Sequence, residues 1–143
     1  MPRESNGSAK LHLELMDVAR VLKKPGRILS VSYDGVLLAT RRLLLEGAGH
    51  RVVSAMGFAE ALSLCDSHFD LIIMGHSIPR KDKVAIVAEL RRRGCAAPLL
   101  SLLRHGDKPL AEAVEWIEAD QPQELLKAVS RILKKSRARA KRG

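Results

Sequence analysis

The strongest strand signal in the chain is the stretch Phe69-Asp70-Leu71-Ile72-Ile73-Met74, which leads directly into Gly75-His76-Ser77. Its nearly continuous apolar character is typical of a parallel strand that is covered on both faces. Shorter strand-like runs precede it at residues 28–31 and 51–54, and others follow at residues 98–103 and 114–117. We therefore expect five strands.

Amphipathic segments separate these strands and predict helices at residues 36–46, 59–66 and 82–93. Residues 109–114 form a short helix at most. A final helix is expected after Asp120, with Pro122 in its first turn. Strands that alternate with helices predict an α/β fold: a doubly wound five-stranded parallel sheet with helices on both faces.

The length of 143 residues favours one domain with additions at its ends. Residues 1–10 are predicted to be a flexible lead. Residues 11–24 are predicted to form an extra N-terminal amphipathic helix, a candidate surface for self-association into a homodimer. The main domain is expected at residues 27–134, and residues 135–143 form a basic tail.

The charge is concentrated at one end of the chain. The formal net charge is +9, yet seven basic residues and no acidic residue lie between Arg131 and Gly143. The remainder carries only about +2. The tail could be a disordered, solubilising extension, a contact for nucleic acid, or a contact for an acidic partner or membrane surface. Its candidate nucleic-acid contacts are Lys134, Lys135, Arg137, Arg139, Lys141 and Arg142.

Composition excludes several classes of protein. The uncharged stretch Gly94 to Leu103 is too short to span a bilayer, so no membrane insertion is expected. Residues 1–10 lack the apolar region of a secretory signal. Cys65 and Cys95 are too few for a disulfide scaffold or a zinc site, and Cys95 is expected to be the more exposed of the two. We expect a cytoplasmic protein.

Residues 27–134 resemble the receiver domain of two-component response regulators, which are CheY-like proteins. The resemblance rests on the order of the elements and on a set of short segments: Arg27-Ile28-Leu29, Glu46 to Val52, Phe69 to Met74, Pro79 with Asp82, and Pro122 to Leu126. It implies a flavodoxin-like fold and a part in phosphorelay signal transduction.

The same resemblance implies that the phosphorylation pocket is degenerate. Ser32 and Tyr33, followed by Asp34, stand where a receiver has its acidic pair. Gly75 stands at the phosphoacceptor aspartate, Leu103 at the hydroxyl residue and Glu118 at the lysine. Because Mg²⁺ is usually held by carboxylates together with phosphate and water, Asp34 alone is a poor site. We expect no aspartyl phosphorylation, no bound metal and no cofactor.

His76 and Ser77, with Asp34 nearby, could form an alternative nucleophile or phosphorylation site, although shaping the loop is the favoured interpretation. No strand end offers a coherent acid, base and nucleophile, so the chain is not expected to be an enzyme. Trp116 is either a partner contact or a core residue. The charges of the predicted loop Arg80-Lys81-Asp82-Lys83 could bind an anion or an acidic partner, although solvated charges are the favoured interpretation.

These observations lead to two functional hypotheses. The first is an atypical response regulator, a pseudo-receiver that acts through contact with a protein partner and without conventional phosphorylation. The alternative is a regulatory protein associated with nucleic acid through the basic tail.

Overall fold

The structure is a computed structural model, and it describes residues 25–66 and 68–142. The predicted flexible lead at 1–10 and the predicted helix at 11–24 lie outside the described residues. Everything below concerns the described part of the chain.

Five parallel strands form one sheet, as expected from the sequence. Their order is β2-β1-β3-β4-β5, the flavodoxin-like order. The bounds are Arg27–Ser32 for β1, Arg51–Met56 for β2, Leu71–Met74 for β3, Leu99–Leu103 for β4 and Glu115–Glu118 for β5. The central strand β3 is buried along its whole length, which explains its continuous apolar sequence.

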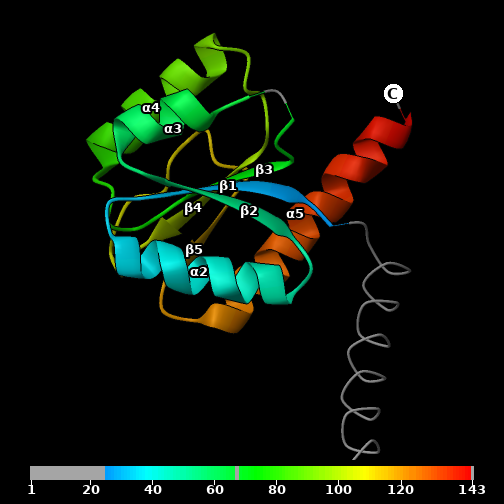
Figure 1. Cartoon of the computed structure of the whole chain (residues 1–143), viewed down its shortest axis with the longest axis horizontal. Helices are drawn as coiled ribbons and strands as arrows, with labels where there is room; N and C mark the ends of the chain where they lie inside the picture. The colour runs from blue at the N-terminus through cyan, green and yellow to red at the C-terminus, as the bar shows by residue number, and fades with distance from the viewer. Residues whose placement is uncertain (1–24, 67, 143) are drawn as a thin grey trace, which may run out of the picture.

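Four described helices cover the two faces of the sheet (Figure 1). Helix α2 spans Gly35–Gly47, α3 spans Phe58–Leu64, α4 spans Arg80–Arg92 and α5 spans Pro122–Arg142. One apolar cluster joins the sheet to α3 and α4, and a second joins its other face to α2 and α5. The doubly wound fold predicted from the sequence is therefore confirmed.

The connection from β4 to β5 contains no helix in its described residues 104–114, which agrees with the expectation of a short helix there at most. The backbone N–H of Arg104 donates to Asp107 Oδ2 at 3.0 Å, and Gly106 has a positive φ of 89°, so the segment begins as a tight turn. The connection therefore supplies no helix to cover β5. Consequently, Val114 and Trp116 are 57% and 51% exposed.

Helix α5 continues through the basic segment to Arg142. Its buried face ends with Ile132 and Leu133, and the rest of the helix runs beyond the sheet (Figure 1). No helix in the described residues is long and apolar enough to cross a membrane.

The expectation for Cys95 is wrong, because its side chain is only 1% exposed. Gly94 adopts a φ of 90°, which turns the chain back after α4, and the Cys95 backbone N–H then donates to the Leu90 carbonyl at 2.9 Å. Cys95 therefore packs into the core between the sheet and α4, against which the half-buried Cys65 also packs.

Candidate functional site

The carboxyl ends of the strands form the candidate site, as in other folds of this class. Two serine hydroxyls meet at its centre. Ser32 at the end of β1 is fully buried, and its hydroxyl lies 2.8 Å from the Ser77 hydroxyl in the loop after β3. Each hydroxyl also accepts a backbone N–H, from Asp34 at 3.1 Å and from Tyr33 at 3.0 Å respectively. These hydroxyls are thus used to join the two loops.

Asp34 serves as the N-cap of α2. Its Oδ1 accepts the backbone N–H groups of Val36 at 2.9 Å and Leu37 at 3.2 Å. An N-cap of this kind contributes about 1 kcal/mol to stability. The carboxylate that follows the predicted acidic-pair positions is therefore engaged in holding the start of a helix.

Tyr33 connects the end of β1 to the start of α4 across the site. Its hydroxyl donates to Asp82 Oδ2 in the first turn of α4 at 2.8 Å. Partial burial, together with this hydrogen bond and the Asp82 charge, raises the pKa of Tyr33 to about 12. Tyr33 consequently remains protonated and neutral near pH 7.

The space beside Gly75 is occupied by an arginine from α2. A Cβ atom placed on Gly75 would lie 2.7 Å from Arg41 Nη1, 3.0 Å from the Val31 carbonyl oxygen and 3.3 Å from Ser32 Cβ. Arg41 is only 6% exposed. Its Nη1 has no hydrogen-bond partner among the described residues. A buried cation therefore lies at the position where the resemblance implies an acidic side chain.

Arg41 also fixes His76. Its Nη2 donates to His76 Nδ1 at 3.0 Å, and since a guanidinium only donates, the ring proton is placed on Nε2. Burial lowers the pKa of His76, and the positive charges of Arg41, Arg104 and Lys83 lower it further. His76 is thus neutral at physiological pH.

His76, Ser77 and Asp34 do not share hydrogen bonds with one another in the described part of the chain. His76 is paired with Arg41, Ser77 with Ser32 and Tyr33, and Asp34 with the start of α2. No base among the described residues is placed to activate the Ser77 hydroxyl, which agrees with the interpretation of these residues as loop-shaping groups.

A second buried cation enters the site from the opposite face of the sheet. Lys83 on α4 is 3% exposed, and its Nζ donates to Ser101 Oγ at 3.0 Å and to the Leu102 carbonyl at 2.7 Å. Burial lowers the pKa of Lys83 to about 8. The prediction of a solvated loop is wrong for this residue, because residues 80–83 form the first turn of α4 and Lys83 faces the core.

The remaining predicted site residues lie on β4, on β5 and at the start of α4. Leu103 is buried at the end of β4, while Glu118 is exposed and its Oε1 lies 3.1 Å from His105 Nδ1. Arg80 and Lys81 are exposed on α4, and Trp116 is half exposed on β5. The alternatives for Trp116 are thereby resolved in favour of a surface position. No group of three or more metal-ligating side chains occurs among the described residues.

Sequence reasoning missed Arg41 and Ser101 and placed Lys83 in a loop, although a signal for both buried cations was present. Leu38, Arg41 and Leu45 share the buried face of α2 at spacings of three and four residues. Lys83 precedes Ile86, Val87 and Leu90 on the buried face of α4 in the same manner. A cation on the apolar stripe of a helix indicates a buried charge.

Several solved structures with the same fold are described as receiver domains or response regulators. The chain is similar to the signal receiver domain of a putative Luxo repressor protein from Vibrio parahaemolyticus, with 16% identity and a TM-score of 0.70 over 82% of this chain and 96% of that one. It is also similar to a CheY-like receiver domain from Methanospirillum hungatei, with 20% identity and a TM-score of 0.69 over 81% and 99%.

NtrX from Brucella abortus gives a TM-score of 0.73 at 20% identity, over 82% of this chain and 29% of that protein. No protein-family model matches the sequence, and no curated protein matches it. The resemblance to CheY-like receivers is thus confirmed as a likeness of fold.

Proposed function

We propose that this chain is an atypical receiver module that takes part in response-regulator signalling through protein contact, without conventional aspartyl phosphorylation. The observation that supports this proposal most strongly is the position of the Arg41 guanidinium against Gly75. Glycine supplies no carboxylate to accept a phosphoryl group. The buried Arg41 side chain fills the space beside Gly75, so a side chain could not be added at residue 75 without displacing it.

The electrostatics of the site support the same proposal. A receiver of the usual kind places carboxylates around Mg²⁺, whereas Arg41 and Lys83 are the buried charged groups here. Asp34, the nearby carboxylate that follows β1, is engaged as a helix cap. Two buried positive charges oppose the binding of a divalent cation.

The exposed side of β5 is the proposed partner contact. Trp116 lies on the edge strand β5, Val114 lies two residues before it and just ahead of the strand, and both residues are more than half exposed. Half-exposed tryptophan is enriched at protein interfaces. Arg80 and Lys81, exposed at the start of α4, are a second candidate contact.

The test is a pull-down with the full chain from a cell lysate, with and without a small phosphodonor and Mg²⁺. We expect the same partner to be captured in both conditions and to be lost with Trp116→Ser. Capture that requires the phosphodonor, together with a mass increase of one phosphoryl group on the chain, would contradict the proposal.

One observation favours a second candidate, association with nucleic acid. The basic segment extends α5 as a helix beyond the sheet, where it is accessible to a long polyanion (Figure 1). The test compares DNA binding by the full chain and by residues 1–133 across a salt series. A steep salt dependence that disappears on truncation would support this candidate, and equally weak binding by both would exclude it.

A further inference from the structure

A cavity of about 220 Å³ lies beside the site, between the start of α4 and the loop after β4. Five of its twelve lining residues carry or can carry a positive charge: His76, Arg80, Lys83, Arg104 and Lys108. Asp107 is the single carboxylate in the lining. With His76 neutral, the charged groups sum to about +3, although the body of the chain is nearly neutral.

Lys83 is the feature that distinguishes this cavity from a group of solvated surface charges. It lies in the lining although only 3% of the residue is exposed. The two acceptors of its Nζ, the Ser101 hydroxyl and the Leu102 carbonyl, are neutral. An ammonium group has three donors, so one donor remains for a further acceptor. A buried charge is costly when no opposite charge contacts it.

The lone acid does not neutralise Lys83 by direct contact. Asp107 Oδ2 accepts the backbone N–H of Arg104 at 3.0 Å, which holds the turn after β4. Asp107 does exert an attractive effect on the Lys83 ammonium, but burial dominates and the pKa of Lys83 falls to about 8. The positive charges of Arg104 and Lys83 also act on His76 and contribute to lowering its pKa.

The backbone around the cavity adds to its preference for anions. Ile78, Pro79 and Arg80 in the lining lead into α4, a helix of 13 residues. Its N-cap is Pro79, and no side chain caps the free N–H groups of the first turn. The positive end of the helix dipole and these N–H groups favour an anion.

We propose that this cavity is a binding site for a small oxyanion, and that a phosphate monoester is the class of ligand that fits it. Lys83 and the Nε2–H of His76 would contact the phosphoryl oxygens from within, while Arg104 and Lys108 would approach from the loop. The volume is below that of sites for drug-sized molecules, which begin near ~300 Å³. The binding is non-covalent and requires no acceptor at Gly75, so it is independent of the proposed signalling role.

The test is an NMR titration of the full chain at constant ionic strength, with inorganic phosphate, phenyl phosphate and sulfate as separate probes. We expect saturable shifts confined to the backbone amides of residues 76–83 and 104–108. Tighter binding of phenyl phosphate than of inorganic phosphate would identify an organic monoester as the source of the phosphoryl group. The reverse order would identify free phosphate.

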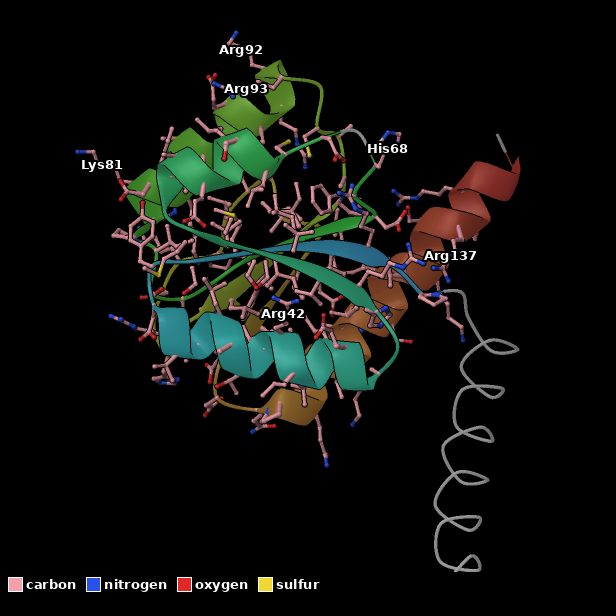
Figure 2. All side chains as sticks on the ribbon, viewed as in Figure 1. Arg42, His68, Lys81, Arg92, Arg93 and Arg137 are labelled. Carbon is pink, nitrogen blue, oxygen red and sulfur yellow. The ribbon has the colours of Figure 1, made fainter. Side chains whose placement is uncertain are left out.

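Three variants make the result specific. Arg104→Gln combined with Lys108→Gln changes two exposed residues, so the fold is retained, and it should weaken phosphate binding about tenfold or more. Lys83→Met should weaken it at least as much. Lys81→Gln is the matched control, because Lys81 is next to Arg80 yet projects outward from the body and does not line the cavity (Figure 2).

The proposal is supported if only the cavity variants weaken binding. It is overturned if the shifts do not saturate, if they spread along the basic part of α5, or if Lys81→Gln weakens binding as much as the double variant does. Binding that survives Lys83→Met unchanged would also overturn it.

Discussion

The Arg41 guanidinium packs against Gly75 so closely that a Cβ at residue 75 would lie 2.7 Å from Nη1. The two residues come from α2 and from the end of β3, which are far apart in the sequence. Glycine permits this approach because it has no side chain, and the arginine in turn fills the space left beside the strand. The two residues therefore depend on each other.

This dependence predicts a coupling between substitutions at the two positions. Gly75→Ala should lower the free energy of unfolding by about 1–3 kcal/mol, because the added methyl group overpacks a closed space. In an Arg41→Ala background the same substitution should cost less, by about 0.5–2 kcal/mol. Urea denaturation of the four proteins measures the cycle. Additive effects would show that Arg41 does not occupy this space.

Lys83 predicts a pH dependence of stability with a defined sign. Its pKa is about 8 in the folded protein, against 10.5 for an unperturbed lysine, so the unfolded state binds more protons between these values. The cost of burying the ammonium is fully present below about pH 8 and is relieved as the pH rises. The wild type should gain up to about 3 kcal/mol relative to Lys83→Met between pH 8 and pH 10.5.

The comparison with Lys83→Met is needed because other groups titrate in the alkaline range. Burial raises the pKa values of Tyr33 and Cys65 to about 12, which destabilises the folded state at high pH. Both groups are present in the two proteins, so their effect cancels in the difference. A difference that stays constant with pH would mean that Lys83 is not a buried ammonium.

Asp34 should behave as a helix cap rather than as a metal ligand. Asp34→Ala should lower the free energy of unfolding by about 1 kcal/mol, since two backbone N–H groups of α2 lose their acceptor. Asp34→Asn should keep most of the stability because asparagine caps equally well. Thermal unfolding with and without Mg²⁺ checks both points. Stabilisation of the wild type by Mg²⁺ that is lost in Asp34→Asn would argue for a metal site.

Trp116 should contribute little to folding despite its size. It is 51% exposed, so Trp116→Thr should change the free energy of unfolding by less than about 1 kcal/mol. Ile132→Ala is the contrasting variant, because Ile132 is 3% exposed and its truncation should cost about 2–5 kcal/mol. A large loss of stability with Trp116→Thr would place this residue in the core.

The parallel sheet could be predicted from the sequence because its strands are short, apolar and separated by amphipathic helices. The run from Phe69 to Met74 indicated a doubly covered strand, although β3 itself begins only at Leu71. The connection after β4 was predicted to contain a short helix at most, and the turn at Gly106 leaves residues 104–114 without one. The exposure of Trp116 follows from that local structure.

The candidate site could be predicted only in part. The order of the strands indicated which residues lie at their carboxyl ends, and the resemblance to receiver domains implied which of those positions lack an acidic residue. The sequence did not indicate what lies there instead, since Arg41 and Lys83 reach the site from two different helices on opposite faces of the sheet. Such contacts depend on tertiary packing. The position of each cation on an apolar helix face was the available clue.

The proposed function requires that the carboxyl edge of the sheet, where Arg41 and Lys83 are buried, does not accept a covalent phosphoryl group. The most direct test is NMR of the full chain with Mg²⁺ and then beryllofluoride, with the backbone amides of Gly75 and Ser32 observed. We predict that neither amide shows a saturable, Mg²⁺-dependent shift. A saturable, Mg²⁺-dependent shift of the Gly75 amide would contradict the account.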